Sequence, residues 1–188
     1  MNRRTLLLAG MVLLVAMTRL LPHPPNFTPL GALALFGGAQ FRSRWAGFLV
    51  PLAALLLSDA ALQAITTLGW ASGWLAQGTG FYPGMWVVYA AIALVTAIGL
   101  LLRRRKSVPA VAGGVLAGST LFYLVTNFAW WIGYDLYPHT LEGLLQSYTA
   151  ALPFYRWTLL GDACYATVLF GGLALAERRY PALRPAAA

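Results

Sequence analysis

The chain has 188 residues, of which 60% are hydrophobic and only 10% charged, whereas a soluble globular domain usually carries about 25% charged residues. This composition argues against an ordinary soluble protein, and the net charge of +8 is dispersed between apolar segments, so no nucleic-acid partner is expected. A single cysteine, Cys164, excludes an intrachain disulfide and a zinc site built from several thiolates.

Six apolar segments follow one another along the chain, at about 5–21, 27–41, 45–68, 83–102, 108–133 and 157–176. Their lengths scatter around the roughly 20 residues that a helix needs to cross a hydrocarbon layer about 30 Å thick. None shows the period-two alternation of barrel strands. We therefore predict an all-α polytopic membrane protein in which residues 1–188 form a single domain with six transmembrane helices.

Lysine and arginine gather in alternate loops, which predicts the orientation of the six spans. With the N-terminus inside, eleven of the thirteen basic residues are cytoplasmic: Arg3, Arg4, Arg42, Arg44, Arg103, Arg104, Arg105, Lys106, Arg178, Arg179 and Arg184. The segment 69–82, expected outside, has no charged residue. We predict a multi-pass N-in/C-in protein of the bacterial inner (cytoplasmic) membrane, surrounded by the lipid bilayer.

The first segment resembles a signal peptide, but no small-x-small cleavage site follows Met17, so we interpret this segment as a membrane span. In the second, Thr28 is the expected N-cap and Pro29 the first helical residue. A helix ending at Phe41 would cover only about 20 Å, so its outer end should lie sunken in the membrane. Its N–H groups would suit a ligand oxygen, which makes Asn26 and Thr28 candidate binding residues. A tilted or bilayer-thinning helix is the alternative.

Two carboxylates, Asp59 and Asp162, interrupt the third and sixth segments, where an ionisable group is costly. Gln63 shares a helical face with Asp59 because it follows four residues later. Two interpretations stay open. The carboxylates pair with Arg19 and Arg156 as structural ties, or they line a cavity that binds a substrate.

The fifth segment carries Tyr123, Asn127, Trp130 or Trp131, and Tyr134 at spacings of three and four, which places them on one helical face. Such an aromatic stripe is common in helix packing. A buried amide without partners costs about 1–3 kcal/mol, however, so Asn127 favours a ligand cage over packing alone.

Two histidines, His23 and His139, fall in the expected outer loops and could ligate a metal or the cobalt of a corrinoid. Loop histidines usually meet water, so no metal site and no cofactor are predicted. Residues 134–156 are expected to form a loop long enough to close over an outer pocket as a lid. Cys164 is expected to be an inert, buried thiol.

Four stretches resemble a family of small bacterial six-span membrane proteins described only as transport proteins: Asn26 to Ala39, Leu57-Ser58-Asp59, Thr126-Asn127-Phe128 with Trp130-Trp131, and Pro153 to Asp162. Six spans in 188 residues with an outer pocket also resemble the S-components of energy-coupling-factor (ECF) vitamin transporters, and more distantly the BtuM-type cobalamin transporters. This resemblance implies capture of a vitamin-like molecule and an energising module as partner. Two features depart from it: Leu13 follows Ala9 where S-components show a small-xxx-small docking pattern, and no cysteine corresponds to the cobalt ligand of BtuM-type proteins.

The leading hypothesis is a membrane transporter or S-component-like subunit that captures a small vitamin-like molecule, a corrinoid being one candidate, in an outward-facing pocket. The candidate substrate-binding residues are Asn26, Thr28, Asp59, Gln63, Asn127, Trp130, Trp131, Tyr134, His139 and Asp162. The partners would be this small molecule and an energising module or a second copy of the chain.

No catalytic residue is assigned and no enzymatic activity is expected, since the sequence contains no Walker loop, Rossmann fingerprint, metalloprotease histidine pair or nucleophile elbow. Two alternatives stay open. One is a small membrane enzyme acting on a lipid-linked substrate with Asp59 and Asp162 as acid and base. The other is a ligand-free structural or assembly subunit in which these carboxylates are only ion-paired.

Overall fold

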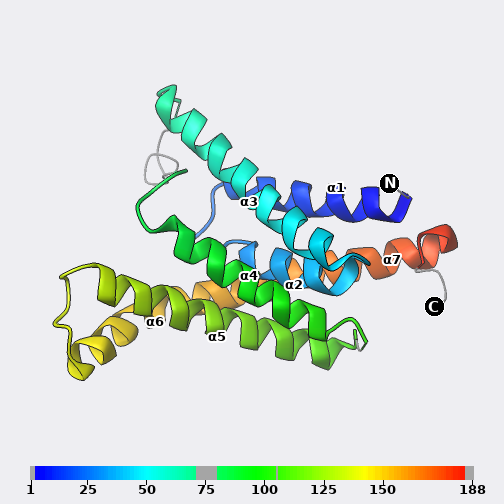
Figure 1. Cartoon of the computed structure of the whole chain (residues 1–188). Coiled ribbons are helices and arrows are strands. Elements are labelled where there is room, and N and C mark those ends of the chain that lie inside the picture. Colours follow the sequence, from blue (N-terminus) through cyan, green and yellow to red (C-terminus); the bar gives the residue numbers. More distant parts are fainter. Residues whose placement is uncertain (1–2, 71–79, 105, 185–188) are drawn as a thin grey trace.

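The computed structural model describes residues 3–70, 80–104 and 106–184, and every regular element in these ranges is helical (Figure 1). The elements are α1 (Arg3–Met17), η1 (Thr18–Leu20), α2 (Leu30–Gln40), α3 (Arg44–Thr67), α4 (Met85–Leu101), α5 (Val108–Gly133), α6 (Leu141–Ala166), the π-helix η3 (Thr167–Gly171), α7 (Gly172–Arg179) and η4 (Pro181–Leu183). Helices α6, η3 and α7 follow one another without a break as one rod. The predicted all-α class is confirmed for the part of the chain that the structure describes.

Three helices are long and apolar enough to cross a membrane by length and composition: α3, α5 and the 39-residue rod from Leu141 to Arg179. Helices α2 and α4 are also apolar but have only 11 and 17 residues. At 1.5 Å per residue they cover about 17 and 25 Å, less than the thickness of the hydrocarbon layer. The three long helices indicate a helical membrane protein.

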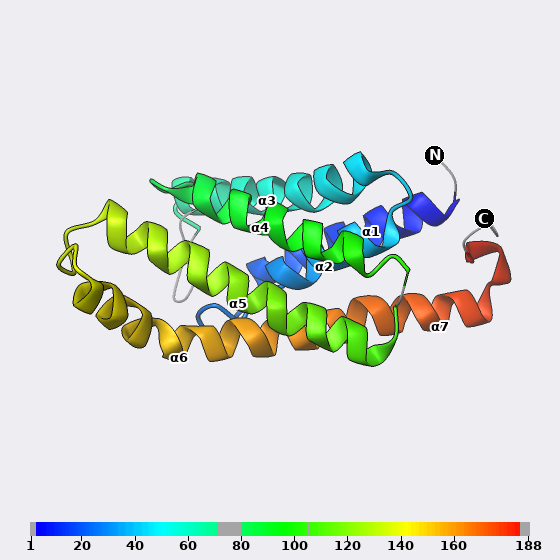
Figure 2. The same ribbon diagram turned by 60° about the horizontal axis from the view of Figure 1, so that its bottom comes forward.

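Helix α2 occupies the centre of the molecule (Figure 2). Its residues 31–39 are all buried, and it packs against α1, α3, α4, α5 and α6. A helix that is apolar on every side is stable only when other helices surround it completely. The run from Leu30 to Ala39 contains no charged residue, and Gln40 ends the helix where the arginine-rich loops begin. The sequence of α2 therefore suits this central place.

Helices α2 and α4 approach closely because glycines meet where they cross. A Cβ atom at Gly38 would collide with the carbonyl oxygen of Thr96, and one at Gly99 would collide with that of Leu35. Small residues at a crossing let two backbones approach and gain van der Waals contact, which drives helix association in lipid. The short α2 is thereby held along the neighbouring α4.

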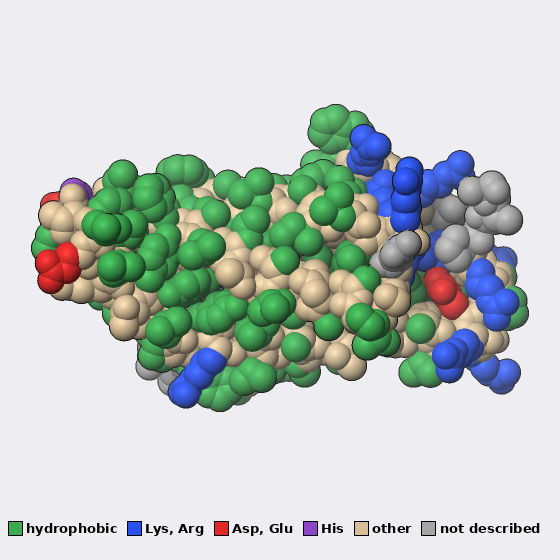
Figure 3. All heavy atoms as spheres, turned by 90° about the horizontal axis from the view of Figure 1, so that it is seen from below, with side chains coloured by type: hydrophobic (Ala, Val, Ile, Leu, Met, Phe, Trp, Pro, Cys, Tyr) green, Lys and Arg blue, Asp and Glu red, His purple; other side chains and the backbone are tan. Residues whose placement is uncertain are grey.

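Basic residues gather at one end of the molecule (Figure 3), and the two ends of the chain lie near each other at one end in Figure 1. Arg4 forms an ion pair with Glu177 and donates a hydrogen bond to the carbonyl oxygen of Leu183 at 2.6 Å. Arg103 closes the C-terminal end of α2, because its Nε donates to the carbonyl oxygen of Gly38 at 2.9 Å. Figure 3 shows a broad hydrophobic surface between this arginine-rich end and the opposite end, as a membrane-embedded protein requires.

The lid expected at residues 134–156 is wrong, because α6 begins at Leu141 and includes most of that stretch. Thr140 caps the helix, its hydroxyl accepting from the N–H of Gly143 at 3.2 Å. The helix then continues through Pro153. Membrane helices tolerate an interior proline where neighbouring groups satisfy the freed carbonyl. Most of the uncharged segment 69–82 lies outside the described residues, since 71–79 are not described.

Candidate functional site

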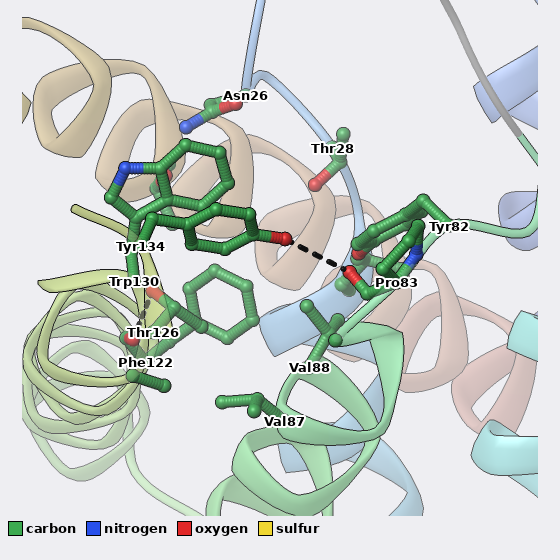
Figure 4. Close-up of a pocket in the computed structure, with 14 residues that line it drawn as sticks. Asn26, Thr28, Tyr82, Pro83, Val87, Val88, Phe122, Thr126, Trp130 and Tyr134 are labelled. Atoms are coloured by element: carbon green, nitrogen blue, oxygen red, sulfur yellow. Dashed lines mark hydrogen bonds between the residues drawn. The ribbon is translucent and has the colours of Figure 1, made fainter. Parts of the chain in front are cut away.

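A cleft of about 330 Å³ lies between α4, α5, α6 and the segment that precedes α2, beside the C-terminal half of α5 (Figure 4). It is lined by Asn26, Thr28, Leu30, Tyr82, Pro83, Gly84, Val87, Val88, Phe122, Thr126, Ala129, Trp130, Tyr134 and Thr158. None of these side chains is charged. Pockets of this size hold small organic ligands when a few polar groups converge on an apolar wall.

Helix α5 and its C-cap residue Tyr134 supply the aromatic wall of the cleft. Phe122, Thr126, Trp130 and Tyr134 follow one another at intervals of four residues, which aligns them along one face. The rings of Trp130 and Tyr134 stack with centroids 4.2 Å apart. The hydroxyl of Tyr134 then donates to the carbonyl oxygen of Pro83 at 3.5 Å and forms a rim across the cleft (Figure 4).

The opposite wall is the segment 80–84, which α3 holds in place. The side-chain oxygen of Gln63 accepts a hydrogen bond from the N–H of Phe81 at 3.1 Å. Gly84 caps α4 with a φ of 81°, a left-handed conformation that glycine adopts without strain. Burial raises the pKa of Tyr82, and the negative charge of Asp59 adds to this effect, so the phenol stays neutral. Gln63 therefore positions the cleft wall, although it does not line the cleft.

The segment before α2 contributes two polar side chains to the cleft. Asn26 adopts a left-handed conformation, with a φ of 64°, and lies beside Trp130 at the mouth of the cleft (Figure 4). Within the described residues, neither the Asn26 amide nor the Thr28 hydroxyl has a hydrogen-bond partner. Both groups can therefore bond to a ligand without giving up a contact in the protein.

A second, smaller cleft of about 170 Å³ adjoins the first and is where Asn127 lies. Five residues line both clefts: Asn26, Phe122, Thr126, Trp130 and Thr158. The amide of Asn127 donates to the carbonyl oxygen of Tyr123 in its own helix at 2.8 Å. Tyr123 and Asn127 thus line the neighbouring cleft, while Trp130 belongs to both.

Asp59 does not line the cleft: it is 3% exposed, and each of its two carboxylate oxygens has a partner within the protein. Its Oδ1 lies 2.6 Å from Nη1 of Arg19, and its Oδ2 accepts from the hydroxyl of Tyr89 at 2.7 Å. The same arginine donates to the hydroxyl of Ser58 at 2.5 Å. The pairing of Asp59 with Arg19, one of the two interpretations left open, is confirmed. Asp59 lies outside the lining of both clefts.

Asp162 is 2% exposed and caps the N-terminus of α2 from the side. Its Oδ1 accepts from the N–H of Ala32 at 2.9 Å, and its Oδ2 accepts from the Ser119 hydroxyl at 2.7 Å. Gly31 makes room, because a Cβ atom there would collide with the carboxylate. The anion site expected at the start of α2 therefore exists, but a carboxylate of this chain fills it.

Three further expectations from the sequence need correction. Thr28 is not the N-cap, since α2 begins at Leu30 with Pro29 in the cap position and no side-chain cap bond. Arg156 does not pair with Asp162 but lies over the ring of Trp157, 5.3 Å from its centroid. Cys164 is exposed rather than buried.

Trp131 and His139 do not line either cleft. The indole N–H of Trp131 donates to the carbonyl oxygen of Pro138 at 2.9 Å, and its ring packs edge-on against His139 with centroids 5.5 Å apart. Together they fix the short connection between α5 and α6. No group of three or more histidine, cysteine or acidic residues occurs within the described ranges, so these ranges contain no cluster suited to a metal.

Sequence reasoning missed part of the cleft, including Phe122, Thr126 and Thr158. The spacing of four residues that links Trp130 to Tyr134 extends backwards to Thr126 and Phe122, and this signal was present in the sequence. Tyr82 and Thr158 carry no such signal, since the chain folds them in from distant segments.

The chain belongs to a family of unknown function, DUF6580. The family model matches residues 1–183, which is nearly the whole chain. No curated protein and no solved structure matches the chain.

Proposed function

We propose that this protein is a substrate-capturing subunit of a membrane transporter, and that the cleft at Trp130 binds a small, uncharged, flat molecule of the vitamin type. The observation that carries the proposal is the combination of an aromatic wall with two unpartnered polar groups, Asn26 and Thr28, among the described residues. Flat heterocycles stack on aromatic rings and use their edges for hydrogen bonds.

The charge of the cleft restricts the ligand class. Every lining side chain is neutral, and the two buried carboxylates are bonded to groups of the protein. A charged ligand would lose its hydration without finding a counter-charge, which is costly in a membrane interior. The cleft volumes of about 330 and 170 Å³ favour a compact heterocycle over a corrinoid, which is much larger.

The same contacts argue against the membrane-enzyme alternative in the form that uses Asp59 and Asp162. A general acid or base must lie within hydrogen-bond reach of the reacting group. Asp59 is closed off by Arg19 and Tyr89, and Asp162 by Ser119 and the start of α2. Neither carboxylate lines the cleft, so binding is the activity that its residues support.

The proposal includes a topology of six spans with both termini in the cytoplasm of a bacterial cell. The arginine-rich end then faces the cytoplasm, in line with the preference of lysine and arginine for that side. The cleft opens toward the outside, where a substrate would arrive. An energising module would contact the cytoplasmic end, as in the S-components that the sequence resembles.

The proposal is tested on the full chain purified in mild detergent. Small molecules extracted from the protein are identified by mass spectrometry and quantified per mole of protein. We expect one neutral aromatic compound to be enriched, and Trp130→Ala to lower its occupancy roughly tenfold because a stacking wall is lost.

Trp45→Ala is the matched control, because Trp45 is an exposed tryptophan of α3 that lines neither cleft. It should leave the occupancy unchanged. A compound lost equally from both variants, or no compound above the level in empty detergent, would remove the basis for the transport proposal.

A further inference from the structure

A groove of about 460 Å³ runs along the outside of α5 and the α6–α7 rod, near the arginine-rich end. Val115 and Ala166 are buried in its floor, and Phe170 lies beside them. The groove follows the rod from Leu159 to Ala174, a rise of about 22 Å at 1.5 Å per residue. One leaflet of the hydrocarbon layer is about 15 Å deep, so the groove is long enough to follow a lipid chain through it.

Small side chains keep the groove open to the surface. Ala112 of α5 and Ala163 and Ala174 of the rod are exposed along its rim. A Cβ atom at Gly171, within the π-helix η3, would meet no atom within 4 Å. The two helices therefore leave space between them that no side chain of the described residues fills.

Positive charge gathers at one end of this groove. Lys106 lines it and is the one charged residue among its lining groups. The ammonium of Lys106 donates to the Oε1 of Gln40 at 3.2 Å, and Arg4 donates to the same oxygen at 3.1 Å. Glu177, the acidic residue nearby, is already paired with Arg4. Lys106 is thus left without an anionic partner among the described residues.

The environment of Lys106 accordingly disfavours its positive charge. Partial desolvation lowers the pKa of its ammonium although the residue is exposed, and the nearby positive charges of Arg4 and Arg103 lower it further, while Glu177 opposes the effect. An anion beside Lys106 would relieve this repulsion. The position fits a lipid phosphate, because Lys106 lies in the loop between α4 and α5 at the end of an apolar groove.

We propose that the groove is a binding site for an anionic phospholipid of the surrounding bilayer, with one acyl chain along α5 and the α6–α7 rod and the phosphate beside Lys106. The apolar lining matches the chain, and the single basic residue at the groove's end matches the headgroup. Basic pockets between membrane helices bind anionic headgroups by this combination of charge and apolar contact. The site is separate from the cleft and does not depend on the proposed transport function.

The test is native mass spectrometry of the full chain in detergent, titrated with phosphatidylglycerol or with phosphatidylcholine of the same acyl chains. We expect one phosphatidylglycerol per chain to bind more tightly than phosphatidylcholine. Lys106→Gln should weaken it roughly fivefold, the effect of one basic residue near an anionic lipid surface. Ala112→Phe should weaken both lipids, because the ring occupies the groove.

Two matched controls make the result specific. Arg104→Gln removes one positive charge from the same loop but not from the groove lining, and Ala117→Phe adds a ring to an exposed position of α5 outside the groove. Both should bind phosphatidylglycerol like the unaltered chain and keep its helical circular dichroism. Equal affinity for the two lipids would overturn the proposal. So would an equal loss in Arg104→Gln and Lys106→Gln, or a dimer in solution that Ala112→Phe dissociates.

Discussion

Arg19 and Asp59 illustrate how a buried ion pair ties three elements together at the scale of single residues. The guanidinium comes from η1, the carboxylate from α3, and Tyr89 of α4 donates the second hydrogen bond. The side chains are only 14% and 5% exposed, so removing one partner leaves the other charge without water. Because of these contacts, we expect Asp59→Ala to reduce stability rather than ligand binding.

We predict that Asp59→Ala lowers the free energy of unfolding by about 3–5 kcal/mol, the usual cost of leaving one buried charge unpaired. Thermal unfolding in detergent measures the change. The double variant with Arg19→Met and Asp59→Leu should regain most of the loss, since it removes both charges. Arg156→Gln serves as control, because this exposed residue lies over Trp157. If Asp59→Ala unfolds at the same temperature as the unaltered chain, the ion pair is not structural.

Asp162 offers a second prediction at this scale. Asp162→Ala removes the cap of α2 and leaves the hydroxyl of Ser119 without its acceptor. Buried groups that lose a charged partner cost about 1–3 kcal/mol each, so we expect a loss of about 3 kcal/mol or more. Asp162→Asn should lose less, because its amide oxygen can still accept from the N–H of Ala32. Equal losses in the two variants would mean that packing, not capping, explains the role of Asp162.

At the scale of elements, the crossing of α2 and α4 depends on glycine. Gly99→Val is expected to lower the free energy of unfolding by at least about 1–3 kcal/mol, because the valine side chain would collide with the backbone of α2. Gly113→Val is the matched control, since a Cβ atom there meets nothing within 4 Å. Unfolding midpoints of the two variants compare them directly. Similar losses in both would show that helix propensity, rather than the crossing, explains the effect.

Much of each helix could be predicted from apolar length, but the start of α6 could not. The sequence predicted a loop over 134–156, because the sixth apolar segment was placed at 157–176. The helix persists there because Thr140 caps its start and membrane helices tolerate an interior proline. Element boundaries depend on such tertiary support, which a single sequence does not display.

The candidate site was predictable in its aromatic part and at Asn26 and Thr28, but not at the two carboxylates. Trp130 and Tyr134 were found because their spacing places them on one helical face. Asp59 and Asp162 were assigned to the pocket because an ionisable group inside a span is costly, whereas their partners come from segments up to 130 residues away. Depth in a membrane constrains where a polar group lies, but not which neighbour it faces.

At the scale of the whole molecule, the distribution of basic residues predicts how the chain is oriented in the membrane. Reporter fusions after Lys106 and at the C-terminus should report a cytoplasmic location, and one near residue 76 an external location, because basic residues favour the cytoplasmic side. Arg4 contacts Glu177 and Leu183, so α1 and the end of the described chain lie on the same side of the molecule. Opposite signals from the fusions after Lys106 and at the C-terminus would contradict this arrangement.

The cap on α2 also implies an order of events while the ribosome makes the protein. Asp162 follows Ala32 by 130 residues, so the nascent chain has no carboxylate for the start of α2 until α6 emerges. Before that moment, water is the available partner for those N–H groups, and α2 should stay near the membrane surface.

A chain stopped after Gly133 and carrying Ala34→Cys should therefore react with a water-soluble thiol reagent. The complete chain with Ala34→Cys and Cys164→Ala should resist it, because residue 34 is buried at the centre. Equal protection in both would mean that α2 is inserted before its cap exists.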